Sequence, residues 1–154
     1  MATPKMQPFW WFKKPPCPSG EQIINGDFED GETGWTFGSA NSNISTAYAH
    51  SPTHSVFSYS DGTGFYQAIS NLPVACVQSL TFWAISPHGT GTMQIKITYT
   101  DDTYTLIDYS HEDSWTQEDV TAQLEAGKTI KEVRFLSSTD NPTYIDDVSL
   151  IGTG

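Results

Sequence analysis

Hydrophobic and polar residues alternate most clearly between positions 92 and 100. Four apolar side chains fall on one face of an extended segment and three polar ones on the other: Met93, Ile95, Ile97 and Tyr99 against Gln94, Lys96 and Thr98. A period of two predicts a β-strand with one face in a core and one in solvent. Asp101 and Asp102 follow this segment and predict a tight hairpin turn into the next strand.

The same pattern predicts an all-β domain. Short segments rich in β-branched and aromatic residues alternate with turn residues at close spacing, which is typical of a β-sandwich or barrel. The predicted strands span 22–24, 43–50, 55–60, 64–70, 77–86, 92–100, 104–109, 116–120, 130–138 and 143–151. A helical turn is predicted only at 119–126.

The first 19 residues differ from the rest of the chain. Prolines flank a short aromatic run made of Phe9, Trp10, Trp11 and Phe12. Proline excludes this run from a helix interior and from a central strand. The segment also carries Lys5, Lys13 and Lys14 and has no acid. We therefore predict an extended connector arm at 1–19 and a folded domain at 20–154.

Composition narrows the function classes. The chain has a net charge of −11, and the body beyond the arm has only four cations against 18 acids. Such an acidic body argues against nucleic acid and anionic membranes as partners. The chain has no transmembrane run, and the N-terminal apolar stretch is too short for a secretory signal. Charged residues make up only 16 % of the chain, and Ser, Thr, Asn and Gly are abundant, which suits a β-rich extracellular protein.

The sequence predicts no enzyme. It has no nucleophile elbow, no zinc-binding His-Glu-x-x-His and no phosphate loop. Two pairs of neighbouring acids, Asp101/Asp102 and Asp146/Asp147, are available. Neighbours in a strand point to opposite faces, so neither pair forms an acid/base couple.

Motifs near the two ends of the body carry a family resemblance. Residues 23–29 read Ile-Ile-Asn-Gly-Asp-Phe-Glu and precede Gly34-Trp35, and residues 144–150 read Tyr-Ile-Asp-Asp-Val-Ser-Leu. His54-Ser55, the segment 65–69 and Ser114-Trp115 lie between them. Residues 21–151 resemble the jelly-roll carbohydrate-binding modules of xylanases, within the galactose-binding-like group. They also resemble the domain that precedes collagen-like repeats in spore-surface proteins of Firmicutes.

This resemblance implies a jelly-roll β-sandwich of two antiparallel sheets whose first and last strands lie close together. It implies core positions for Trp35 and Trp115. It also implies a structural calcium ion held by Glu29 and by Asp146 or Asp147, since calcium prefers hard oxygen ligands. The alternative interpretation is that these acids cap turns on an acidic surface.

Glycan binding requires exposed aromatic faces that stack on sugar C–H groups. The candidate contacts are Tyr59, Tyr66, Trp83, Tyr99, Tyr104 and Tyr109. Packing within the core or between strands is the competing explanation and the favoured one for most of them.

The chain has two cysteines, Cys17 in the arm and Cys76 in the body. In an oxidising compartment they can pair within one chain or between chains, and otherwise they remain free thiols. All three states stay open from the sequence.

Two hypotheses follow. In the first, the arm docks on a neighbouring jelly roll through Phe9, Trp10, Trp11, Phe12, Lys13 and Lys14, and the protein polymerises into an extracellular or spore-surface filament. The layout of arm and domain resembles spore appendage subunits of Firmicutes. In the second, the body is a carbohydrate-binding module for a plant or cell-wall polysaccharide, and the arm is a linker.

Overall fold

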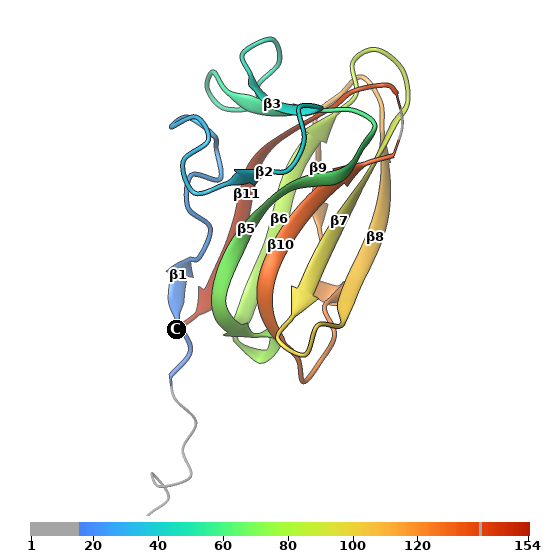
Figure 1. Ribbon diagram of the computed structural model, residues 1–154. Coiled ribbons are helices and arrows are strands. Elements are labelled where there is room, and N and C mark those ends of the chain that lie inside the picture. Colours follow the sequence, from blue (N-terminus) through green and yellow to red (C-terminus); the bar gives the residue numbers. More distant parts are fainter. Residues whose placement is uncertain (1–15, 139) are drawn as a thin grey trace, which may run out of the picture.

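Two antiparallel sheets stack face to face in the computed structural model, which describes residues 16–138 and 140–154 (Figure 1). Among these residues, six strands form one sheet: β1 (Ser19–Glu21), β3 (Ser42–Ser45), β4 (Ser55–Ser58), β6 (Val77–Ile85), β9 (Thr116–Asp119) and β11 (Thr143–Thr153). Five described strands form the other: β2 (Thr36–Phe37), β5 (Asp61–Pro73), β7 (Gly91–Tyr99), β8 (Tyr104–His111) and β10 (Thr129–Ser137).

The order of strands within each sheet differs from their order in the chain. The six-stranded sheet runs β3-β4-β11-β6-β9, with β1 also paired to β11, and the five-stranded sheet runs β2-β5-β10-β7-β8. Successive strands therefore cross repeatedly between the two layers. This is the predicted jelly-roll sandwich, and the fold prediction is confirmed.

Strand β7 has the side-chain arrangement predicted by its alternation. Met93, Ile95, Ile97 and Tyr99 are all fully buried between the sheets, whereas the side chains between them face outward. The hairpin after β7 is also confirmed, with Asp102 in the left-handed region at a φ of 69°. The Asp102 amide donates to the carbonyl of Tyr99 over 2.9 Å.

The two ends of the body lie together, as the resemblance implied. Strand β1 pairs with the last residues of β11, and the Val148 amide donates to the carbonyl of Gly26 over 2.9 Å. A Cβ atom at position 26 would lie 2.0 Å from the Val148 carbonyl oxygen, so this approach requires glycine. The paired strand is Ser19–Glu21 rather than 22–24, because Ile23 turns into the core and is 5 % exposed.

Aromatic rings fill the space between the sheets. Phe65 on β5 stacks on Phe135 on β10 with ring centroids 5.2 Å apart, and Phe82 on β6 meets Phe135 edge-on at the same distance. Trp35 packs against Phe28 and Phe65 and is 7 % exposed, which confirms its predicted core position. These contacts join both layers into one core.

Other boundaries depart from the prediction. The predicted strand at 43–50 ends at Ser45, and the remainder forms a loop over the six-stranded sheet. The helical turn at 119–126 is a 3-10 turn, η3 (Thr121–Gln123), and a second turn, η2 (Val74–Cys76), was not predicted. The two-residue strand β2 is too short to leave a periodic signal. Within the described ranges, no helix is long and apolar enough to cross a membrane.

Candidate functional site

A row of side chains crosses the outer face of the five-stranded sheet. Arg134 on β10 lies opposite Tyr66 on β5 and, on its other side, opposite Lys96 on β7. Lys96 in turn lies opposite Leu106 on β8. The row faces outward because the residues before and after each of its members point into the core. We call the side chains of Tyr66, Arg134, Lys96 and Tyr104 the tyrosine–cation face.

Arg134 is held in place over one tyrosine. Its guanidinium carbon lies 4.1 Å from the centre of the Tyr66 ring. The Nε group donates to Oε1 of Glu132 over 3.0 Å, and Nη1 donates to the carbonyl of Thr63 over 2.7 Å. A cation above an aromatic ring is attracted by the ring quadrupole. The Tyr66 ring and the guanidinium therefore form a preorganised surface.

Lys96 lies over the second tyrosine. Its Nζ atom is 4.5 Å from the centre of the Tyr104 ring, and Tyr104 is 54 % exposed. The other three cations in the described part of the chain form ion pairs: Lys128 with Asp101 and Glu125, Lys131 with Asp102, and Arg134 with Glu132. Lys96 forms no ion pair with the residues at 16–138 and 140–154. Its positive charge is available to a ligand.

A second group of rings lies at the six-stranded sheet. The imidazole of His50 stacks on Trp83 of β6, with ring centroids 4.0 Å apart, and meets Trp115 edge-on at 5.5 Å. Trp83 is therefore half-covered by the loop after β3. The predicted core position of Trp115 is wrong, because Trp115 packs on this imidazole at the surface and is only partly buried. Tyr59, next to β4, is 36 % exposed and contacts Phe57.

Two of the predicted glycan contacts face the interior, and for them that role is wrong. Tyr99 is fully buried, and its hydroxyl contacts Thr105 Oγ1 over 2.6 Å and accepts the Glu125 amide over 2.9 Å. The Tyr109 ring packs on Phe82 at 5.6 Å, and its hydroxyl is buried. Tyr99 shares the alternation of Met93, Ile95 and Ile97, so the pattern had already placed it inside.

Glu29, the first predicted calcium ligand, is surrounded by hydrogen-bond donors. Thr53 Oγ1 donates to its Oε1 over 2.6 Å, and the amides of Thr53 and His54 donate to Oε2 over 3.1 and 2.7 Å. Desolvation raises the pKa of Glu29, but these hydrogen bonds outweigh it and bring the pKa to about 2. The carboxylate ties the loop at 46–54 to the start of the body.

Asp146 and Asp147 bind the same loop from β11. Asp146 is fully buried, and its Oδ2 accepts the amides of His50 and Ser51 over 2.8 and 2.9 Å. Burial raises the pKa of Asp146 to about 7, although these amides oppose the shift. Asp147 accepts Ser51 Oγ over 2.5 Å and contacts His50 Nδ1 at 2.6 Å.

The donor set around these acids does not fit a calcium ion as it is arranged. N–H and O–H groups face the carboxylate oxygens, whereas calcium requires six to eight oxygen ligands. The described residues also contain no group of three or more His, Cys, Asp and Glu side chains suited to a metal. These contacts agree with the alternative of turn-capping acids. Calcium stays a prediction from the resemblance.

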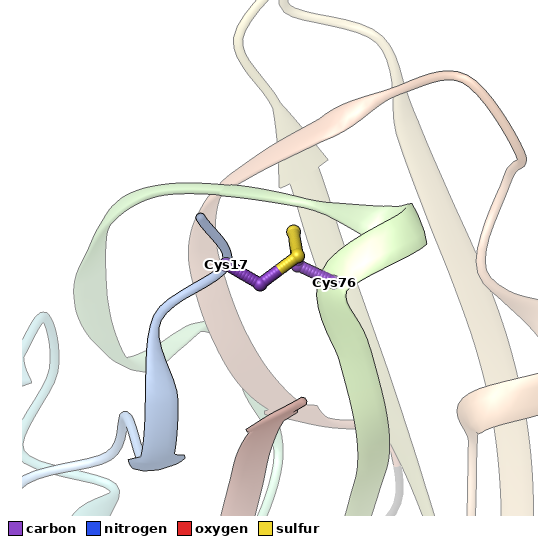
Figure 2. The surroundings of a disulfide bond; sticks show 2 residues. All are labelled: Cys17 and Cys76. Atoms are coloured by element: carbon purple, nitrogen blue, oxygen red, sulfur yellow. A yellow bond between two sulfur atoms is a disulfide. The ribbon is translucent and has the colours of Figure 1, made fainter. Parts of the chain in front are cut away.

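Cys17 and Cys76 form a disulfide within one chain (Figure 2). Their Cα atoms lie 5.3 Å apart, and the bond joins the segment before β1 to the turn η2. It thereby fastens the root of the arm to the body. The arm residues Phe9, Trp10, Trp11, Phe12, Lys13 and Lys14 lie outside the described residues, so the docking prediction is untested.

The fold is that of carbohydrate-binding modules. No family model matches the sequence, and no curated protein matches it. Among solved structures, the C-terminal family 22 carbohydrate-binding module of Clostridium thermocellum Xyn10B is similar, with a TM-score of 0.64 and 17 % identity over 90 % of this chain and 98 % of that one. TmCBM61 in complex with β-1,4-galactotriose has a TM-score of 0.60 and 17 % identity, over 87 % of this chain and 99 % of that one. The family 11 module of C. thermocellum in complex with a β-1,3-1,4-mixed-linked tetrasaccharide has a TM-score of 0.56 and 13 % identity, over 88 % of this chain and 97 % of that one.

These neighbours confirm the resemblance to carbohydrate-binding modules at the level of the fold, whereas the resemblance to spore-surface proteins stays a prediction. Of the predicted glycan contacts, Tyr66 is partly exposed and Tyr104 is exposed, and their role stays a prediction; sequence reasoning did not include Lys96 and Arg134. One signal for them existed, since both occupy outward positions of alternating strands in a body with only four cations. Their proximity depends on strand order, which the sequence does not reveal.

Proposed function

We propose that this protein is a non-catalytic carbohydrate-binding module and that the tyrosine–cation face is its glycan site. The observation that carries the proposal is the outward-facing row itself, in which Tyr66, Arg134 and Lys96 are partly exposed and Tyr104 is exposed. The ring surface that the two cations leave uncovered can stack on sugar C–H groups, and the cations and neighbouring polar groups can bind hydroxyls. The fold shared with modules of this class supports the assignment.

The face also offers side-chain polar groups beside the row. Gln94 on β7 donates to Asp108 on β8 over 2.8 Å, and both side chains face outward. An amide–carboxylate pair of this kind presents free donors and acceptors to sugar hydroxyls. The neighbours named for xylan binding and for β-1,4-galactotriose make β-linked polysaccharides the first ligands to test.

Binding is tested by affinity electrophoresis and isothermal titration calorimetry against soluble xylans, β-galactans and mixed-linked glucans. Tyr66→Ala and Tyr104→Ala are each expected to weaken binding about tenfold or more, because a stacked ring contributes roughly 1–2 kcal/mol. Tyr59→Ala is the matched control, since Tyr59 is also exposed but lies next to the other sheet. The proposal is wrong if the intact protein binds none of a broad polysaccharide panel, or if the control variant loses as much affinity as the other two.

We also infer an extracellular location, and more specifically a cell or spore surface. A disulfide persists in an oxidising compartment and not in a reducing cytosol. Thiol labelling of protein from its native source tests this, because free Cys17 and Cys76 in freshly lysed cells would contradict an oxidised location.

A second candidate function is a self-assembling filament subunit joined by the arm. The fastened root of the arm favours it, because the disulfide transmits a pull on the arm directly into the body. An open depression of about 550 Å³ lies beside this root and is lined by Pro16, Cys17, Pro18, Asn71, Pro73, Ala75 and Cys76. The arm also has the opposite charge to the body.

Electron microscopy and light scattering of the purified chain test assembly. Full-length protein is expected to form filaments, and a variant with serine at positions 9–12 is expected to remain monomeric. A full-length chain that stays monomeric at every concentration rules the filament out. Because the variant keeps Cys17, a change in the disulfide does not explain the difference.

A further inference from the structure

We propose that the tyrosine–cation face selects anionic polysaccharides, with the carboxylate of a uronic acid bound at Lys96 beside Arg134. The inference rests on the proposed function and adds the class of ligand. Of the four cations in the body, two lie directly opposite each other at the middle of one exposed face.

This placement disfavours the fold by itself. Like charges directly opposite one another on neighbouring strands destabilise a sheet. Glu132 neutralises Arg134 through a hydrogen bond of 3.0 Å, and Lys96 is left without an acidic partner among the residues that the structure describes. The face therefore keeps one positive charge that a ligand carboxylate can neutralise. Proteins break local rules of this kind at functional sites.

The aromatic rings place that charge within a sugar-binding surface. Strands β5, β10, β7 and β8 are consecutive neighbours, so about 14 Å separates the strand of Tyr66 from that of Tyr104. Arg134 and Lys96 lie on the two strands between them. Tyr104 lies opposite Thr98, two residues along β8 from Leu106, so a glycan that crosses the strands obliquely meets the Tyr66 ring, the guanidinium, the ammonium and the Tyr104 ring. Arginine and lysine side chains form charge-assisted hydrogen bonds with carboxylates.

The acidic body does not prevent this contact. Exposed charges farther apart than about 8 Å are largely screened at physiological ionic strength. Beside the row, Glu132 is paired with Arg134, whereas the partner of Asp108 is the neutral amide of Gln94. A carboxylate bound at Lys96 lies within hydrogen-bond distance of the ammonium, and this attraction outweighs the repulsion from acids that lie farther away.

The test compares acidic polysaccharides with their carboxyl-reduced forms by isothermal titration calorimetry. Glucuronoxylan, polygalacturonate and alginate are each measured beside the same polymer after reduction of its carboxyl groups. The intact protein is expected to bind at least one acidic polymer about tenfold or more tightly than its reduced form, because a hydrogen bond between charged partners is worth that much. Lys96→Gln is expected to abolish this preference, and Lys96→Arg is expected to retain it.

Lys128→Gln is the matched control. It removes the same charge from a partly exposed lysine whose ammonium is paired with Asp101 and Glu125 at the hairpin end. Equal binding of acidic and reduced polymers overturns the anionic preference and leaves the proposed function standing. An equal loss of preference in Lys96→Gln and Lys128→Gln also overturns it, because net charge alone then explains the effect. Binding to no polymer of either kind overturns both proposals.

Discussion

The imidazole of His111 and the carboxylate of Glu118 join the edges of the two sheets. Nε2 of His111 on β8 lies 2.9 Å from Oε2 of Glu118 on β9, and the imidazole side chain is 1 % exposed. Strands β8 and β9 are the edge strands of their sheets. The contact therefore closes one side of the sandwich with a titratable pair.

We expect the protein to be less stable in mild acid because His111 is buried. Burial lowers the pKa of His111, although Glu118 opposes the shift. The unfolded chain then binds a proton at His111 more readily than the folded chain does. The contribution of His111 to the free energy of unfolding is therefore fully present above the unfolded pKa of about 6.5 and is lost as the pH falls below it. Urea unfolding between pH 8 and pH 5 measures the effect as a decrease in the free energy of unfolding.

A comparison of variants isolates the histidine. The raised pKa of Asp146 acts in the opposite direction, since its contribution to stability falls as the pH rises from about 4 towards 7. We therefore expect His111→Gln to be less stable at pH 8 but less sensitive to acid than the wild type. His88→Gln, at an exposed position, should leave the pH dependence unchanged. An unchanged acid sensitivity in His111→Gln would show that another group is responsible.

We expect the disulfide to contribute strongly to the stability of the fold. The bond joins residues 59 positions apart, and a loop of this length corresponds to about 4 kcal/mol in the chain-entropy description of the unfolded state. Reduction, or the double change Cys17→Ser and Cys76→Ser, is expected to lower the free energy of unfolding by up to about this amount, as measured with urea. The double variant should not respond to reductant. A disulfide-linked dimer on a non-reducing gel would contradict the intrachain bond.

We expect the same substitution to have different effects at two glycines of β5. A Cβ atom at Gly64 would lie 1.8 Å from the carbonyl oxygen of Phe135, and the φ angle of Gly64 is 77°. Gly64→Ala is therefore expected to cost about 2 kcal/mol or more, because both the backbone angle and the contact must change. A Cβ atom at Gly62 would have no neighbouring atom within 4 Å, so Gly62→Ala should be close to neutral. Similar melting temperatures for the two variants would refute this account of Gly64.

Calcium provides a further test at the loop contacts. With N–H and O–H groups directed at Glu29 and Asp146, we expect the same melting temperature in calcium chloride and in a chelator. An increase in calcium that Glu29→Gln abolishes would instead support the ion that the family resemblance implies. An increase that persists in Glu29→Gln would place an ion elsewhere in the chain.

Local patterns alone determined much of the fold. The alternation of Met93, Ile95 and Ile97 with Gln94 and Lys96 is a property of consecutive residues, and burial of one face follows from it directly. The all-β class and the hairpin at Asp102 were predicted for the same reason. The closeness of the two ends of the body was predicted from the motifs shared with a known fold.

Only the tertiary structure decided which distant residues meet. Lys96 and Arg134 lie opposite each other because β7 pairs with β10, and this order depends on how the whole core packs. The same packing brought Cys17 to Cys76 and left Trp115 at the surface against His50. Side-chain periodicity determines which face of a strand is buried, but it carries no information about the neighbouring strand. The candidate glycan site is a product of that pairing, and the sequence alone named only its two tyrosines.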